Sequence, residues 1–186
     1  MIANWKHNKY QLPAILAITV NILTCHDGVL AGHMIHAYNL HMKKVGNLEV
    51  ISGPMFCGKT EELIRRVRRA QIANLRVVVI KHALDIRYKK RNVYSHSKQT
   101  LRSKVVKNAK DILNKVDRTT QVVAIDEAMW FGKELIPIVN RLVYSGKRVI
   151  VTGLSTTFTA EPFEPIPSLM AVAERVDKLT SICTLC

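Results

Sequence analysis

The sequence predicts an α/β fold in which a parallel sheet is flanked by helices. Short runs of β-branched and aliphatic residues recur between residues 48 and 152. Such continuous apolar runs are typical of strands that are buried on both faces. Segments with apolar residues at helical spacing follow two of these runs. Strands that alternate with helices form parallel sheets of the doubly wound class.

The first half of this pattern is a strand, a helix and a second strand. Residues 48–52 form a short β-branched run that stops at a glycine, which predicts a strand. Residues 61–73 contain two Glu–Arg pairs at i, i+4 spacing, which support a helix. The predicted buried face of this helix carries Leu63, Val67 and Ala70. Residues 76–81 include four consecutive β-branched residues, which indicates a second strand, buried on both faces.

The second half repeats the pattern further along the chain. Residues 122–126 form an apolar run that ends on an acidic residue, which predicts a third strand. Residues 134–145 have apolar residues at helical spacing, with a proline in the first turn and a glycine directly after the last turn. Residues 148–152 form a fourth strand, which ends at a glycine.

Composition limits the class of protein. The chain has 186 residues, of which 48% are hydrophobic and 23% are charged, as in a globular chain with one ordinary domain and a small appendage. This composition excludes a disordered tail, a collagen-like fibre and a coiled coil. The 28 Lys and Arg exceed the 14 Asp and Glu, and this net charge of +14 favours anionic partners. Four cysteines do not make a disulfide framework, so we expect a reduced, cytoplasmic location.

The first 41 residues differ in composition from the rest. They hold five of the seven histidines but only two lysines and one acidic residue. The apolar stretch at 12–23 is too short to span a bilayer, so we expect no membrane association. His33 and His36 have an i, i+3 spacing that gives only weak support for a metal site. We expect residues 1–41 to be an extension outside the fold, with Met42 as the natural start.

A phosphate-binding motif follows the first predicted strand. The sequence Gly-Pro-Met-Phe-Cys-Gly-Lys-Thr fits the pattern G-x-x-x-x-G-K-[ST] and lies between a strand and a helix. Its glycines would let backbone N–H groups surround phosphate oxygens, while the lysine reaches the β- and γ-phosphates and the threonine hydroxyl binds Mg²⁺. The alternative is a glycine-rich turn with an exposed lysine. The predicted nucleotide-binding residues are Gly53, Pro54, Met55, Phe56, Cys57, Gly58, Lys59 and Thr60.

Two acidic residues end the third predicted strand. Asp126 could hold Mg²⁺ directly or through water, and Glu127 could take a proton from an attacking hydroxyl. Both follow a strand of the predicted parallel sheet, at the carboxyl edge where ligands bind in open α/β folds. The alternative is a pair of solvated loop acids. These residues predict a nucleotide-binding P-loop enzyme but do not identify the acceptor.

The motifs closely resemble those of the type II thymidine kinases. The likeness includes the phosphate loop with its following helix, Lys-His-Ala-Leu-Asp-Ile-Arg-Tyr at 81–88, Ile-Asp-Glu-Ala-Met-Trp-Phe at 125–131 and Thr-Gly-Leu-Ser-Thr-Thr-Phe at 152–158. It covers about residues 45–186 in collinear order. The resemblance implies a RecA-like P-loop NTPase fold and transfer of the γ-phosphate of ATP to the 5′-hydroxyl of thymidine.

The resemblance also implies roles for individual residues. Lys59, Glu127 and Arg87 would be catalytic, with Glu127 as the general base and Arg87 on the transferring phosphate. Thr60 and Asp126 would bind Mg²⁺. The nucleotide-binding set would extend to Asp85, Asp126, Glu127, Ala128 and Met129, the last at a position where the family usually has Gln. The thymine ring would contact Met55, Trp130 and Phe158, although patterning alone would place the two aromatic residues in the core.

The C-terminus resembles the beginning of the family's zinc-binding lobe. Cys183 and Cys186 match two of four Zn²⁺ ligands, and a structural zinc site needs all four. Zn²⁺ is therefore expected only if other ligands are supplied. We interpret residues 42–177 as the kinase domain and 178–186 as the first part of a truncated zinc-binding and lasso domain. Family members form homo-oligomers, usually tetramers.

Two other functions remain open at this stage. Without the lasso over thymidine, the chain could be an ATP-binding remnant with no turnover. It could also be a nucleic-acid-binding P-loop ATPase, because residues 87–118 hold eleven Lys or Arg against two Asp. We favour a solvated hairpin and helix for this basic stretch, since no aromatic-rich segment of the kind found in single-strand binders interleaves with the charges. We therefore expect thymidine and ATP as partners, with no nucleic acid.

Overall fold

A computed structural model describes residues 45–85, 92–94 and 100–182. The chain divides into two units, Met1–Met42 and Lys43–Cys186, and the described residues all belong to the second. Within these residues, no helix has the length and apolar character needed to cross a membrane.

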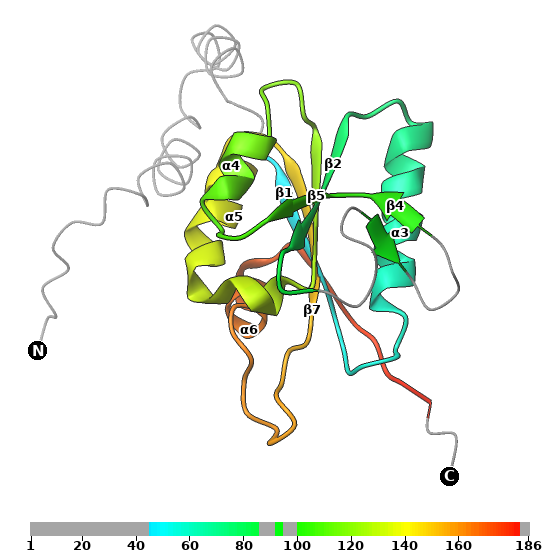
Figure 1. Cartoon of the computed structure of the whole chain (residues 1–186), viewed down its shortest axis with the longest axis vertical. Helices are drawn as coiled ribbons and strands as arrows, with labels where there is room; N and C mark the ends of the chain where they lie inside the picture. The colour runs from blue at the N-terminus through cyan, green and yellow to red at the C-terminus, as the bar shows by residue number, and fades with distance from the viewer. Residues whose placement is uncertain (1–44, 86–91, 95–99, 183–186) are drawn as a thin grey trace, which may run out of the picture. The chain divides into compact units, whose positions relative to one another are not determined.

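A six-stranded sheet, parallel throughout, forms the centre of this unit (Figure 1). Its order is β5-β2-β6-β7-β1-β8. The strands are β1 (Asn47–Ser52), β2 (Val77–His82), β5 (Lys104–Val106), β6 (Val122–Asp126), β7 (Arg148–Gly153) and β8 (Arg175–Lys178). The four predicted strands are confirmed as the four inner strands, and the predicted α/β class is confirmed with them. The two edge strands were not predicted because they are short and carry charged residues.

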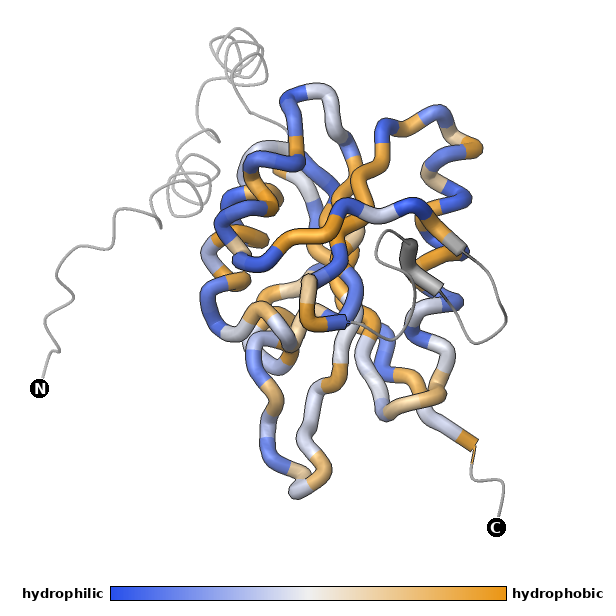
Figure 2. The backbone as a smooth tube through the Cα atoms, viewed as in Figure 1, coloured by the Kyte–Doolittle hydropathy of each residue, from blue (hydrophilic) through white to orange (hydrophobic). Residues whose placement is uncertain are grey.

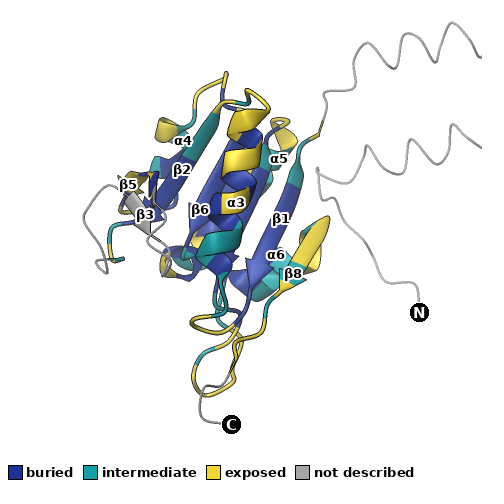
Figure 3. Cartoon of the chain, turned by 90° about the vertical axis from the view of Figure 1, so that its right-hand side faces the viewer, coloured by how far each residue is buried: buried dark blue, intermediate teal, exposed yellow. Residues whose placement is uncertain are grey.

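Helices cover both faces of the sheet. On one face lie α3 (Lys59–Ile72) and a separate antiparallel ribbon of β3 (Asn92–Tyr94) and β4 (Thr100–Arg102). Figure 3 shows α3 lying across the strands on this side. The other face is covered by α4 (Asp111–Lys115), the 3-10 segment η1 (Ala128–Glu134), α5 (Leu135–Tyr144) and α6 (Ile166–Val172). The basic stretch thus contains the expected hairpin and helix, and also β5, which joins the main sheet.

Each face of the sheet has its own apolar core. On the α3 side the core includes Leu63, Ile64 and Val67 of the helix, packed with Leu101 of β4 against alternate strand residues. On the opposite side, residues of α4, η1, α5 and α6 pack against the other strand positions. Figure 2 shows the hydrophobic colour concentrated along the inner strands. Strands buried on both faces explain the continuous apolar runs in the sequence.

The connections from β1 and β7 define where a ligand can bind. The chain leaves β1 into α3 on one face, whereas it leaves β7 into α6 on the other. These two strands are neighbours in the sheet. Adjacent parallel strands whose connections go to opposite faces leave a crevice at their carboxyl ends, where open α/β folds bind ligands. The phosphate-binding motif lies at this end of β1.

Candidate active site

The loop between β1 and α3 needs its two glycines. Gly53 has φ 153°, and a Cβ atom there would lie 2.4 Å from the carbonyl oxygen of Leu179. Gly58 has φ 86° and directly precedes the first residue of α3. Since other residues rarely adopt these backbone conformations, the glycines allow a tight loop that leads into a helix N-terminus. Backbone N–H groups in such a loop, together with the positive end of the 14-residue helix, favour phosphate.

Lys59 is held against this loop rather than in solvent. The residue is 8% exposed, and its Nζ donates hydrogen bonds to the carbonyl oxygen of Pro54 at 2.5 Å and to Sγ of Cys57 at 3.7 Å. An ordinary glycine-rich turn would carry an exposed lysine, so this burial favours the phosphate-binding interpretation. Thr60 follows in the first turn of α3 and is half-buried.

Asp126 ends β6 as a deeply buried carboxyl group. It is 4% exposed and accepts a hydrogen bond from Oγ1 of Thr152 at 2.5 Å. Burial raises the pKa of Asp126 to about 6, and the nearby charges of Glu127 and Asp85 act in the same direction. Asp126 is therefore not a solvated loop acid. A carboxyl group with a raised pKa at the carboxyl end of a sheet strand is typical of a functional site.

Glu127 has the backbone of a sharp turn. Its φ of 48° lies in the left-handed region, which residues other than glycine seldom adopt. The residue is half-buried and directly precedes η1. Backbone strain of this kind often marks functional sites, where the rest of the fold holds the residue in place.

The carboxyl end of β2 adds a buried ion pair that the sequence analysis did not single out. Nζ of Lys81 lies 2.9 Å from Oδ2 of Asp85, and both side chains are less than a tenth exposed. Lys81 is the register partner of Asp126 on the neighbouring strand β6. Lys81 and Thr152 were both missed as site residues. Each is a polar residue at the carboxyl end of a predicted apolar strand, and this signal could have identified them.

The predicted thymine-contacting residues are exposed in three separate segments: the phosphate loop, η1 and the loop after β7. Met55, Trp130 and Phe158 are 49%, 43% and 101% exposed, and none belongs to either core. Their exposure argues against the ordinary-core interpretation of the two aromatic residues and leaves their contact with thymine a prediction. Ala128 and Met129, by contrast, are buried.

Several predicted site residues lie outside the described part of the chain. These are Arg87, the zinc-ligand candidates Cys183 and Cys186, and the histidine pair His33 and His36. Within residues 45–85, 92–94 and 100–182, no group of three or more His, Cys, Asp or Glu is arranged to hold a metal ion. The zinc prediction therefore stays untested.

A groove among the described residues runs beside α3. It has a volume of about 610 Å³ and includes Arg65, Arg68 and Arg69 together with Asp177 and Leu179. It meets the phosphate loop only at Gly58, so it is a neighbour of the site rather than the site itself.

The fold and the site together define a P-loop nucleotide-binding protein. The glycine loop follows β1, and the buried acid ends β6, which lies two strands away with β7 between them. The family model described as thymidine kinase matches residues 46–186. The chain belongs to the thymidine kinase family, as the motifs predicted.

A curated relative supports this assignment. The chain is 51% identical over 146 residues to "Thymidine kinase" of Rhodothermus sp. (strain ITI 518). The matched region covers 78% of this chain and 68% of the relative.

Solved P-loop structures are more distant. The genome packaging NTPase B204 of Sulfolobus turreted icosahedral virus 2 is 16% identical, with a TM-score of 0.48 over 75% of this chain and 77% of its own. Domain III of the replication initiation protein DnaA from Thermotoga maritima is 17% identical, with a TM-score of 0.45 over 80% of this chain and 60% of its own. The fold class follows from the order of the six strands, without these likenesses.

Proposed function

We propose that this protein transfers the γ-phosphate of ATP to the 5′-hydroxyl of thymidine. The observation that carries the proposal is the complete phosphate loop after β1, on a parallel sheet in which only β7 separates β1 from the strand that ends at the buried Asp126. This arrangement supports phosphoryl transfer, and membership of the thymidine kinase family supports thymidine as the acceptor.

The loop and helix α3 would bind the phosphates of ATP. Backbone N–H groups of the loop, other than at Pro54, would surround the phosphate oxygens, and Lys59 would exchange its contact with the Pro54 carbonyl for a phosphate oxygen. Thr60 and Asp126 fit Mg²⁺, because hydroxyl and carboxylate oxygens are its preferred protein ligands and Asp126 is already fixed by Thr152. When bound, Mg²⁺ offsets the negative charge that develops on the transferring group.

Glu127 would act as the general base. Its carboxylate would accept the proton of the 5′-hydroxyl as that oxygen forms a bond to the γ-phosphorus. The bond between the γ-phosphorus and the bridging oxygen breaks, so ADP leaves with the electron pair. Arg87 would stabilise the transferring phosphate. Met55, Trp130 and Phe158 would contact the thymine ring, because their exposed apolar and aromatic surfaces are suited to a flat base.

The family resemblance supports three further parts of the proposal. We propose a cytoplasmic homo-oligomer, with a tetramer as the expected form. Residues 42–177 would form the kinase domain and residues 178–186 would begin a zinc-binding lobe. Two cysteines do not complete a zinc site, so no step of the reaction is assigned to zinc.

Phosphorylation of radiolabelled thymidine by the purified chain tests the proposal. ATP-dependent formation of thymidine monophosphate is expected, with a loss of about a hundredfold or more in Lys59→Ala, because the lysine stabilises charge on the transferring phosphate. Glu127→Gln should reduce kcat by about a hundredfold or more while ATP still binds. The control is Lys115→Ala, an exposed lysine of α4 on the opposite face of the sheet.

The outcomes separate the alternatives. Turnover that survives Lys59→Ala would contradict the assignment of the phosphate loop. ATP binding without any turnover by the unmodified chain would contradict kinase activity and leave the ATP-binding remnant. Binding of mixed-sequence DNA that weakens steeply with salt and is unaffected by thymidine would support the nucleic-acid-binding ATPase instead.

A further inference from the structure

The buried ion pair at the end of β2 has no role in the mechanism described so far. We propose that Lys81 is a positioning residue for the magnesium–nucleotide site, which it serves by holding the carboxylate of Asp85 beside Asp126. This proposal rests on the proposed function, since it concerns the same phosphate-binding edge of the sheet. Lys81 itself would not contact the nucleotide.

The burial of Lys81 is unusual for a lysine. The residue is 2% exposed and lies on an inner strand, with β5 on one side and β6 on the other. Lysine is almost never fully buried unless it is paired, and well-packed apolar residues often replace buried ion pairs without loss of stability. A purely structural strand end would therefore suit an apolar residue at least as well.

Strand alternation places Lys81 on the same side of the sheet as the phosphate loop. Two residues earlier on β2 and β6, Val79 and Ala124 belong to the core beneath α3. Successive side chains of a strand point to opposite faces, so Lys81 and its register partner Asp126 also point toward the α3 side. The hydrogen bond to Asp126 places Thr152 in the same row. The row thus crosses the carboxyl ends of β2, β6 and β7, where Mg²⁺ would bind.

The turn that carries Asp85 does not depend on this ion pair. Its backbone is held by three hydrogen bonds: from Ala83 N to Val106 O at 2.8 Å, from Leu84 N to Nδ1 of His82 at 3.0 Å, and from Asp85 N to His82 O at 3.1 Å. The contact with Lys81 instead fixes the carboxylate of Asp85 at the end of this anchored turn. Its effect is therefore on the direction of a side chain and not on the path of the backbone.

Lys81 also balances charge at this edge. The carboxyl groups of Asp85 and Glu127 lie close enough to Asp126 to raise its pKa. The cation of Lys81, on β2, attracts the Asp85 carboxylate and opposes its repulsion from Asp126. Without Lys81, we expect the Asp85 carboxylate to be held less firmly beside Asp126, so that the carboxyl groups at this end of the sheet are less well ordered when Mg²⁺ binds. Groups that orient metal ligands typically change metal affinity 10–100-fold when they are removed.

Calorimetric binding of ADP, with Mg²⁺ and then with EDTA, tests the proposal. The ratio of the two dissociation constants measures how much Mg²⁺ strengthens nucleotide binding. In Lys81→Met this ratio should fall about tenfold, while the dissociation constant in EDTA changes less than twofold. Lys81→Arg keeps the charge and should recover much of the ratio. Asp85→Asn should lower the ratio by a similar factor. Because Lys81 acts through Asp85, the double variant with Lys81→Met and Asp85→Asn should show little further loss.

Lys147→Met is the matched control. Lys147 is also buried, but it lies just before β7, at the opposite end of the sheet, and its Nζ donates to the carbonyl oxygens of Thr120 and Asp117. This variant should lower the melting temperature and leave the Mg²⁺ ratio unchanged. If Lys81→Met does not fold, Lys81→Gln and Asp85→Asn provide the same measurement.

The proposal is overturned in three cases. These are an unchanged ratio in Lys81→Met, an equal loss of ADP affinity with and without Mg²⁺, or absence of any Mg²⁺ effect in the unmodified chain. Thymidine phosphorylation by the unmodified chain is measured separately. If the ratio behaves as expected but thymidine is not phosphorylated, the proposed reaction fails while the positioning role stands.

Discussion

At the scale of single residues, Asp126 lies in an environment that is unfavourable for its charge. Its carboxyl group is fully buried between β2 and β7, with a hydrogen bond from Thr152 and with Glu127 and Asp85 nearby. Burial raises its pKa from the ordinary value of 3.8 to about 6. The folded chain therefore binds this proton more tightly than the unfolded chain does. A residue kept at such a cost to stability is consistent with a role in binding a cation.

Replacement of this carboxyl group should stabilise the fold in a pH-dependent way. As pH rises from about 4 to 6, this carboxyl group ionises in the unfolded chain while it stays protonated in the folded chain, so the free energy of unfolding falls. The free energy of unfolding changes little further once pH is well above 6. Asp126→Asn keeps an acceptor for Thr152 and removes the charge. We expect it to raise the free energy of unfolding by about 1–3 kcal/mol at pH 8 and by much less at pH 4. Urea unfolding at both pH values, without Mg²⁺, measures the difference.

Asp117→Asn is a control with the opposite sign. Hydrogen bonds from Thr119 and Thr120 lower the pKa of Asp117 to about 2. Its ionised form therefore favours the fold at pH 8, and the variant should lose stability there. Equal stability of Asp126→Asn and the unmodified chain at both pH values would contradict the burial argument for Asp126.

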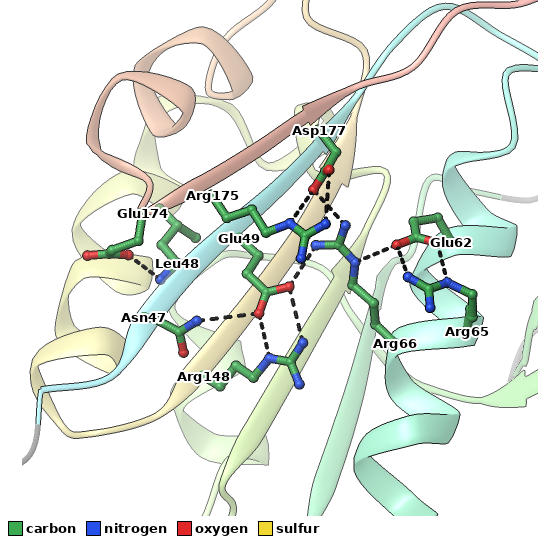
Figure 4. A network of polar contacts seen from close by, with 10 residues as sticks. All are labelled: Asn47, Leu48, Glu49, Glu62, Arg65, Arg66, Arg148, Glu174, Arg175 and Asp177. Carbon is green, nitrogen blue, oxygen red and sulfur yellow. Dashed lines mark hydrogen bonds and ion pairs between the residues drawn. The ribbon is translucent and has the colours of Figure 1, made fainter.

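At the scale of elements, a buried network of charges connects β8 to the rest of the sheet (Figure 4). Arg66 of α3 is fully buried and binds Glu49 of β1 at 2.6 Å, Glu62 of α3 at 2.7 Å and Asp177 of β8 at 2.6 Å. Arg148 of β7 also binds Glu49. Since β8 is a four-residue edge strand with mostly exposed side chains, apolar burial contributes little to holding it in place. The arginine supplies that contact.

Loss of the central arginine should destabilise this junction. Arg66→Met leaves Glu49 with Arg148 as its ion-pair partner beside the amide of Asn47, and it removes the ion pair between α3 and β8. We expect the free energy of unfolding to fall by about 3 kcal/mol at pH 7, because a buried carboxylate loses a partner. Arg65→Met is the matched control, because this neighbouring arginine is half exposed and its pair with Glu62 is worth less than about 1 kcal/mol.

The same effect should depend on pH in a defined direction. The arginines Arg175 and Arg66 lower the pKa of Asp177 to about 2. The stability from this pairing is therefore present above about pH 4 and is lost as pH falls toward 2. The difference between Arg66→Met and the unmodified chain should shrink over that range in thermal unfolding. Similar losses for the Arg65 and Arg66 variants would show that the network is not centred on Arg66.

At the scale of the molecule, the described nucleotide site is built for phosphate more than for a base. The phosphate loop and the N-terminus of α3 favour negative charge, and the row of polar residues at the carboxyl ends of β2, β6 and β7 suits the cation that accompanies it. The chain as a whole carries a net charge of +14, which also favours anionic ligands. The segment directly after β8 lies beside the phosphate loop, because Leu179 N donates a hydrogen bond to Ser52 O at 2.7 Å, next to Gly53.

Ligand-induced stabilisation of the whole fold should therefore depend mainly on phosphate. Magnesium tripolyphosphate at a hundred times its dissociation constant should stabilise the chain by about 2.7 kcal/mol. For a chain of this size that is a rise of about 5–10 °C in melting temperature. Adenosine without phosphates should give a much smaller shift, and Lys59→Ala should lose most of the tripolyphosphate effect. A larger shift with adenosine than with tripolyphosphate would contradict this account of the site.

The sequence by itself determined the local parts of this protein. The phosphate loop and the strand that ends at Asp126 were predictable because each is a continuous segment whose glycines, apolar run and acid define it without distant partners. The four inner strands were predictable because burial on both faces requires unbroken apolar residues. The exposed Trp130 and Phe158 were predicted as site residues only through family resemblance, since patterning alone placed them in the core.

The tertiary structure decided the features that depend on contacts between distant segments. Strand β8 has no apolar pattern of its own and forms by pairing with β1, about 125 residues earlier, while Arg66 binds Asp177. The row of Lys81, Asp126 and Thr152 exists only because strand order places β2, β6 and β7 side by side. Local propensity contains no information about which strand ends become neighbours. Strand order therefore decided which charges lie together at the site, and hence the environment of Asp126.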